Sequence, residues 1–283
     1  MKVRLIACDS LGVRSMCCVV ETASRRILID PGVALAPKRF SLEPHPVELE
    51  AAARVRAAIL SELSQATDVV ISHFHGDHAP MAAPDQSQLP LADFTNHLGS
   101  ARIWVKGGKG ISRLCAERYA AARRVLADRL IEADNRQDGG LTFSGPVPHG
   151  DLGGSVLMTL VTDGTERFVH ASDMQLLDNS AVSVILSWRP DVLFVAGPPL
   201  YLGRLRPAQV AVAWQNSLRL AQAVRTMVID HHLFRSAQGR EWLDQLSQAA
   251  GRRVLCGAEF MSRPLNLLEA QRRQLYATSQ TSV

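Results

Sequence analysis

The sequence predicts an α/β fold. Short apolar runs alternate with longer stretches of helical periodicity along the whole chain, which is typical of this class. Several of the apolar runs end in His or Asp, at the place where α/β sheets carry their sites. The 283 residues, 47% of them hydrophobic and 20% charged, are enough for a full core in a soluble protein. We expect one domain over residues 1–277 and a disordered tail at 278–283.

The N-terminal third begins with three expected strands, at residues 4–8, 15–21 and 26–29. Gly12 and the polar residues 22–25 supply the turns, so an antiparallel meander is predicted. Residues 47–63 then show helical spacing after two prolines. The apolar run at 68–71 is the next expected strand, and it leads directly into a polar cluster.

The rest of the chain continues the alternation. Residues 79–98 lack periodicity and consist largely of Pro, Ala, Asp, Gln and Asn, so we expect a long loop. The hairpin signal Asp163-Gly164 separates two expected strands. The predicted strands are 101–105, 155–162, 167–170, 192–196, 226–229 and 254–256, and the predicted helices are 112–130, 177–187, 207–223, 238–249 and 264–275.

Charge and cysteine usage narrow the function classes. The formal charge is +4, with Lys and Arg scattered and no basic run interleaved with aromatics, so nucleic acid is not an expected partner. No apolar stretch is long enough for a membrane span and the N-terminus lacks a signal-peptide pattern. Five cysteines without a CxxC pair fit reduced thiols. We expect a cytoplasmic location, a small-molecule substrate and a possible homodimer.

The most informative segment is Ser72-His73-Phe74-His75-Gly76-Asp77-His78, which places three imidazoles and a carboxylate directly after a strand. Histidine is the commonest protein metal ligand, and a carboxylate among histidines suits zinc. His73 and His75 share one face of an extended chain, whereas Asp77 and His78 follow a glycine and can turn toward a second point. The spacing favours two metals.

Further metal-capable residues follow later strands, namely His149, His170 with Asp173, and His231 with His232. The ends of neighbouring strands meet at one edge of an α/β sheet, so these side chains are expected to converge on the cluster. His170 is not expected to be a ligand. His45 and His97 are interpreted as structural residues.

In its order of motifs the chain resembles the metallo-β-lactamase superfamily. The cluster from His73 to His78, the isolated His149, Asp173 in a Ser-Asp turn and His231 after a strand reproduce that order, and Leu28-Ile29-Asp30-Pro31-Gly32 resembles the first motif. Segments 10–15, 30–39, 197–202, 230–233, 258–260 and 266–270 resemble a mainly archaeal, uncharacterised branch of predicted metal-dependent hydrolases.

This resemblance implies a four-layered αβ/βα sandwich and a dinuclear site. It implies that one metal is bound by His73, His75 and His149, and that the second is bound by Asp77, His78 and His231. Asp173 would bridge the two metals. His232 competes with His231 as a ligand and is otherwise expected near the substrate; Asp30 resembles a residue that steadies the histidine loop, with a simple turn former as the equal alternative.

The expected activity is hydrolysis by a metal-bridging hydroxide, with two Zn²⁺ as the cofactors and iron or manganese as alternatives. Protonation of the leaving group is expected from Asp77 or from a metal-bound water. The substrate would be a small, anionic phosphodiester or a cyclic ester or amide. A nuclease of the same superfamily and a non-catalytic metal-stabilised binding module are the alternatives. Asp173, where antibiotic-hydrolysing members carry cysteine, speaks against β-lactams.

Residues for substrate contact are less sharply indicated. Tyr201 is a candidate for the pocket wall, and Gly76 and Ala79 stand where the branch carries bulkier residues, so an enlarged pocket is expected. The glycine-rich segment 105–110 lacks the spacing of a phosphate loop. Anion-binding candidates in loops are Lys38, Arg39, Lys106, Lys109, Arg204 and Arg206.

Overall fold

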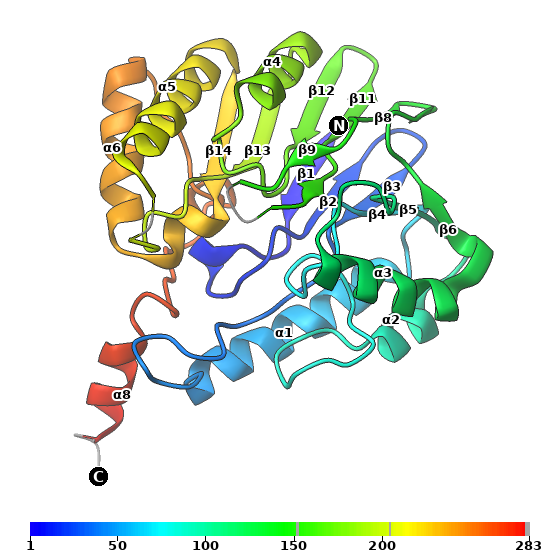
Figure 1. The fold of residues 1–283 in the computed structure, drawn as a ribbon, viewed down its shortest axis with the longest axis horizontal. Coiled ribbons are helices and arrows are strands. Elements are labelled where there is room, and N and C mark those ends of the chain that lie inside the picture. Colours follow the sequence, from blue (N-terminus) through cyan, green and yellow to red (C-terminus); the bar gives the residue numbers. More distant parts are fainter. Residues whose placement is uncertain (151–152, 204, 281–283) are drawn as a thin grey trace.

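Two six-stranded sheets lie face to face, with helices on both outer faces (Figure 1). The computed structural model describes residues 1–150, 153–203 and 205–280. Its layers run helix, sheet, sheet, helix, so the predicted α/β fold and the four-layered αβ/βα sandwich are both observed.

The first sheet is built from the N-terminal half of the chain. Its first three strands form the predicted antiparallel meander, and the other three continue in parallel. The strands are β1 (Lys2–Leu5), β2 (Cys18–Glu21), β3 (Arg26–Ile29), β4 (Asp68–Ile71), β5 (Arg102–Val105) and β6 (Leu130–Glu132). The helices over this sheet are α1 (Pro46–Leu63), α2 (Leu91–His97) and α3 (Arg113–Leu126).

The second sheet has the order β14-β13-β12-β11-β8-β7, with β12, β13 and β14 parallel. The strands are β7 (Gln137–Asp138), β8 (Leu141–Phe143), β11 (Thr159–Asp163), β12 (Glu166–His170), β13 (Val192–Ala196) and β14 (Thr226–Asp230). The helices on its outer face are α4 (Asn179–Trp188), α5 (Pro207–Ala223) and α6 (Gln238–Ala250).

Short elements complete the fold. A two-stranded ribbon of β9 (Val147–Pro148) and β10 (Ser155–Val156) stands apart from both sheets. The remaining elements are the single-turn helices η1 (Asp9–Leu11), η2 (Ala127–Arg129) and η3 (His231–Arg235), and the helices α7 (Gly257–Phe260) and α8 (Arg272–Gln280). The described residues contain no helix long and apolar enough to cross a membrane.

Three groups of buried apolar side chains match the three spaces between the layers. One group, with Leu28, Val69 and Phe94, lies under α1 to α3, and another, with Val169 and Leu220, lies under α4 to α6. The third fills the space between the sheets. A strand such as β4, which is buried along its whole length, therefore has a nearly continuous apolar sequence without polar alternation.

Several predicted elements differ from the structure. Residues 79–98 contain α2, which buries Leu91 and Phe94 and is too short for a clear period. Residues 155–162 divide between β10 and β11, because the ribbon that carries His149 needs its own partner strand. Residues 254–256 make only one bridge, between Val228 and Leu255.

The C-terminal helix was also placed wrongly, since residues 264–271 are not helical and α8 begins at Arg272. Its anchor is the buried ion pair of Arg272 with Glu48, which has no local sequence signal. The predicted disordered tail begins inside α8, which extends to Gln280, and residues 281–283 lie outside the described part of the chain.

Candidate metal centre

The histidine loop follows β4 and is held by Asp30, the residue after β3. Asp30 Oδ1 accepts a hydrogen bond from Ser72 N at 2.7 Å, and Oδ2 accepts one from the Ser72 hydroxyl at 2.7 Å. The Ser72 hydroxyl also lies 2.7 Å from that of Ser172, which precedes Asp173. The ends of β3, β4 and β12 are thereby tied together at the inner edge of the two sheets.

Three strand ends reach the site through a non-glycine residue in the left-handed region. These residues are Asp30 (φ 51°), Ser172 (φ 50°) and His231 (φ 59°), which follow β3, β12 and β14. Such a conformation is costly for an L-residue and persists where surrounding contacts enforce it. Asp30 and Ser172 are held by their hydrogen bonds with Ser72, and the turn at His231 brings its imidazole to Asp173.

Around one oxygen of Asp173 lies the first group of metal-capable atoms. Asp173 Oδ2 is 3.2 Å from His149 Nε2 and 3.7 Å from His73 Nε2, which in turn is 3.0 Å from His75 Nδ1. One atom from each of these four side chains lies within 4.8 Å of the others.

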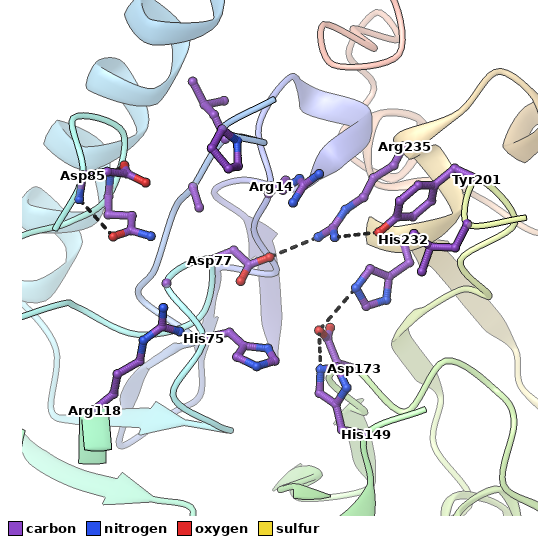
Figure 2. A pocket seen from close by; sticks show the side chains of 16 residues that line it. Arg14, His75, Asp77, Asp85, Arg118, His149, Asp173, Tyr201, His232 and Arg235 are labelled. Carbon is purple, nitrogen blue, oxygen red and sulfur yellow. Dashed lines mark hydrogen bonds and ion pairs between the residues drawn. The ribbon is translucent and has the colours of Figure 1, made fainter. Parts of the chain in front are cut away.

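A second group lies around the other oxygen. Asp173 Oδ1 is 3.3 Å from His78 Nε2 and 3.4 Å from His231 Nε2, and Asp77 Oδ2 is 3.5 Å from His231 Nε2. His232 Nε2 lies 3.6 Å from Asp173 Oδ2, on the cavity side (Figure 2). The seven residues expected as ligands from the resemblance are thus brought together, with Asp173 shared between the groups.

Buried carboxylates orient two of the imidazoles through the ring nitrogen that points away from the site, Nδ1. Asp30 Oδ2 accepts from His78 Nδ1 at 2.8 Å, and Asp9 Oδ2 accepts from His231 Nδ1 at 2.6 Å. These bonds leave the Nε2 atom of both rings facing Asp173, which is the arrangement that orients histidine ligands in metal sites. Asp30 therefore steadies the site as well as forming a turn.

Asp9 and Arg235 were missed by the sequence analysis. Arg235 is 4% exposed, and its guanidinium donates to Asp9 Oδ1 at 2.9 Å. It also donates to Asp77 Oδ2 at 3.1 Å and to the Tyr201 hydroxyl at 3.3 Å (Figure 2). The spacing of Arg235 four residues after His231, in η3, is the one local signal that could have found it. Asp9 lies in η1, which has no motif of its own.

The electrostatics of the cluster favour unprotonated ligand atoms at several positions. Burial, together with the neighbouring His78 and His75, holds the pKa of His73 well below its usual value. Burial also lowers the pKa of His75 to about 4. Although burial opposes ionisation of Asp173, the imidazoles of His78, His231 and His232 hold its pKa well below the usual range.

Burial likewise opposes ionisation of Asp77, but His78, His231 and Arg235 outweigh it and lower the pKa of this carboxyl strongly. For His78 the balance goes the other way, since the carboxylates of Asp173 and Asp30 outweigh burial and raise its pKa. The carboxyls of Asp77 and Asp173 are thus ionised and the rings of His73 and His75 neutral, which are the forms that bind cations. The raised pKa values of His78 and His231 favour a proton on these two rings, which a bound cation would displace.

The donor set fits a pair of cations. Asp173 Oδ1 is buried and has no hydrogen-bond partner among the described residues, although two imidazole nitrogens lie within 3.4 Å of it. His78 Nε2 and His231 Nε2 also face each other at 3.3 Å. In the neutral rings both Nε2 atoms are acceptors, because Nδ1 donates to Asp30 in one and to Asp9 in the other, and facing acceptors are what a shared cation satisfies.

A cavity of about 430 Å³ opens beside the cluster. His75 and Asp77 lie on one side of it, and Tyr201, His232 and Asp173 face them (Figure 2). Its other lining residues are Arg14, Ala34, Leu35, Pro37, Gly76, Asp85, Gln88, Arg118, His149, Leu202 and Arg235.

The candidate residues for substrate contact do not all lie at the cavity. Tyr201 lines the cavity, whereas Lys38 and Arg39 do not. Arg39 instead donates to the carbonyl of Arg235 at 2.9 Å. The fully buried Lys106 pairs with Asp134 at 2.8 Å, so the glycine-rich segment is structural. Lys109 and Arg206 are also absent from the lining, and Arg204 lies outside the described residues.

The histidines set aside in the sequence analysis lie outside the metal groups. His170 donates to the Met16 carbonyl at 3.0 Å, and His97 to the Asp93 carbonyl at 2.8 Å. His45 caps α1 by accepting from Val47 N.

The expected enlargement of the pocket at Gly76 is offset by another side chain. A Cβ atom on Gly76 would lie 2.5 Å from Gln88 Nε2. The space beside the histidine loop is therefore occupied by Gln88, from the segment between Ala79 and α2.

Comparison with known proteins places the chain among relatives of similar length. A UPF0282 protein of Methanosarcina mazei is 48% identical over 279 residues, covering 98% of this chain and 92% of the relative. No family model matches the chain.

Two solved structures share the fold at low sequence identity. An isothiocyanate hydrolase from Delia radicum gut bacteria gives a TM-score of 0.55 at 17% identity, covering 90% of this chain and 95% of that one. The metallo-β-lactamase fold protein YhfI from Bacillus subtilis gives 0.53 at 14% identity, with coverages of 90% and 95%. The chain therefore has the metallo-β-lactamase fold, as the resemblance implied.

Proposed function

The chain belongs to the UPF0282 protein family, and from that premise we propose that it is a metal-dependent hydrolase with a dinuclear centre. The observation that carries the proposal is the position of Asp173 between two groups of metal-capable atoms. Structural neighbours that include a metal-dependent hydrolase of the β-lactamase superfamily support the class of reaction.

His73, His75 and His149 would hold one cation, and Asp77, His78 and His231 the other, with Asp173 as the bridge. Zinc suits this set of imidazoles and carboxylates, and iron or manganese remain chemically compatible. When bound, two such cations supply an activated water and polarise the bond under attack. His231 is the better ligand of the adjacent pair, because its Nε2 belongs to both the Asp77 group and the Asp173 group.

The chain's own residues position this chemistry. Asp30 and Asp9 fix the rings of His78 and His231 through Nδ1, so their Nε2 atoms stay aimed at the site. Asp77 is kept ionised by His78, by His231 and by Arg235, which donates to its Oδ2. Asp77 would therefore accept a proton from the attacking water before passing it to the leaving group, and cannot begin the cycle as an acid.

His232 completes the proposed catalytic residues. Burial and the nearby Arg235 hold its pKa well below the usual value, so its ring is neutral. Its Nδ1 has no partner among the described residues and its side chain lines the cavity, so it can exchange a hydrogen bond with substrate.

A small substrate is favoured over a polymer by the size of the cavity. Its volume of about 430 Å³ lies in the range of small-molecule sites, roughly 300–1,000 Å³. Three arginines line it, and one of them, Arg118, forms no ion pair with a described carboxylate, which supports an anionic substrate.

The test combines metal analysis with a substrate screen. Purified protein should retain about two zinc equivalents after dialysis, and should hydrolyse at least one member of a panel of phosphodiesters, lactones, thioesters and amides. His73→Ala and His231→Ala should each lower metal content and abolish turnover. His97→Gln, at an exposed helix end, is the matched control and should change neither. A wild-type protein that binds no divalent metal would remove the proposal.

A further inference from the structure

The three arginines that line the cavity differ in their partners. Arg14 is neutralised by Glu269, to which its Nε and Nη2 donate at 2.6 and 2.7 Å. Arg235 is neutralised by Asp9 and Asp77. Arg118 is the exception, since its one hydrogen bond among the described residues goes to a main-chain carbonyl.

That carbonyl belongs to the histidine loop itself. Arg118 Nη1 donates to the oxygen of Phe74, the residue between His73 and His75, at 3.1 Å. Figure 2 shows Arg118 rising from α3 toward the cavity beside His75. The bond fixes where the guanidinium stands relative to the metal-capable residues, and it uses one donor of five. The remaining donors carry an unneutralised positive charge into the cavity.

The other polar groups on this side leave that charge uncompensated. The Asp85 carboxylate, which also lines the cavity, accepts from Ser87 N, the Ser87 hydroxyl and Gln88 N. No described carboxylate forms an ion pair with Arg118. The amide of Gln88 is held by its Oε1, which accepts from Asp85 N at 3.1 Å, so its Nε2 is a second donor over Gly76.

We propose that Arg118 binds a second, anionic oxygen group of the substrate, distinct from the bond that the metal centre cleaves. A guanidinium matches both carboxylate and phosphate oxygens in geometry, so the shared chemistry is a terminal oxyanion. This inference rests on the proposed function and deepens it. The substrate then has two parts, a reacting group at Asp173 and an anionic end at Arg118.

The experiment measures binding of malonate, succinate and glutarate, and of their monomethyl esters, to the zinc-loaded protein by titration calorimetry. In the wild type, the dicarboxylate of matching length should bind about tenfold more tightly than its ester, the size expected for a hydrogen-bonded charge. Arg118→Gln should bring this ratio close to one, and Arg118→Lys should keep part of it. A parallel titration with 3-phosphonopropanoate shows whether phosphonate or carboxylate is preferred.

The matched control is Arg113→Gln, on the same helix, whose side chain is 94% exposed and pairs with Glu117. It should retain the wild-type ratio, and circular dichroism checks that every variant is folded. Equal ratios in wild type and Arg118→Gln, or no preference for any dicarboxylate in the wild type, overturn the inference. Zinc content is measured first, so failure to bind metal is seen separately and counts against the proposed function.

Discussion

Asp9 Oδ2 accepts a hydrogen bond from His231 Nδ1 at 2.6 Å, although the two residues are 222 positions apart. The contact joins the loop after β1 to the end of β14, and so the first strand of one sheet to the last strand of the other. Asp9 also accepts from Arg235, which reaches on to Asp77. One buried carboxylate thereby supports two of the four proposed ligands of the second metal, namely His231 directly and Asp77 through Arg235.

Asp9→Asn should weaken the second metal site. Asparagine preserves the shape but not the charge that orients His231, and loss of such a partner typically costs about 10- to 100-fold in metal affinity. Competition with a zinc chelator should show one weakened site and one unchanged site. Asp244→Asn, at an exposed carboxylate on α6, is the control. Two unchanged affinities would contradict the positioning role.

Asp77→Asn should reduce turnover more than metal content. The amide keeps an oxygen for Arg235 but cannot carry a proton, and general acid-base groups contribute about 10²- to 10⁴-fold to rate. Turnover on the best substrate of the screen and zinc content by mass spectrometry are compared on the same sample. Parallel losses of both quantities would mean that Asp77 acts as a ligand alone.

Gly76→Ala should change substrate binding and leave the metal centre intact. The new Cβ would lie 2.5 Å from Gln88 Nε2, the free end of a flexible side chain, so Gln88 moves and the fold remains. When Gln88 moves, its Nε2 no longer donates to the substrate. The loss of one such neutral hydrogen bond lowers affinity by about three- to tenfold. We expect that change in KM, with unchanged zinc content. A fall in zinc content would show that the glycine is needed by the histidine loop instead.

The ion pair Arg272–Glu48 should supply most of the free energy that holds the C-terminal segment to the rest of the fold. Both side chains are completely buried, with Nε to Oε2 at 2.7 Å and Nη2 to Oε1 at 2.8 Å. Arg272→Met leaves a buried carboxylate alone, which costs about 3–5 kcal/mol, and adding Glu48→Gln should recover part of this in urea unfolding.

The control is the exposed pair Arg54–Glu50 on the same helix, α1. Arg54→Met should change the free energy of unfolding by at most about 1 kcal/mol. A double variant at Glu48 and Arg272 that is no more stable than Arg272→Met would show that the ion pair is not the source of the loss.

Elements with strong local patterns were predicted from sequence. The parallel strand β4 and the helices α1 and α5 lie within two residues of their predicted bounds, because buried strands and amphipathic helices leave a record in residue order. No such local pattern marks the short helix α2, the division at β10 or the start of α8. Their bounds depend on contacts with distant segments, such as that of Arg272 with Glu48.

For the site, the sequence by itself determined which residue types are available and in what order, because the ligand types stand at strand ends and strand ends converge. Only the tertiary structure decided which atoms meet. It placed Asp9 behind His231, Arg235 against Asp77, and Arg118 rather than Lys38 at the cavity. Such pairings join segments far apart in the chain, and since hydrogen bonds and charge act over a few ångströms of space, no local pattern encodes them.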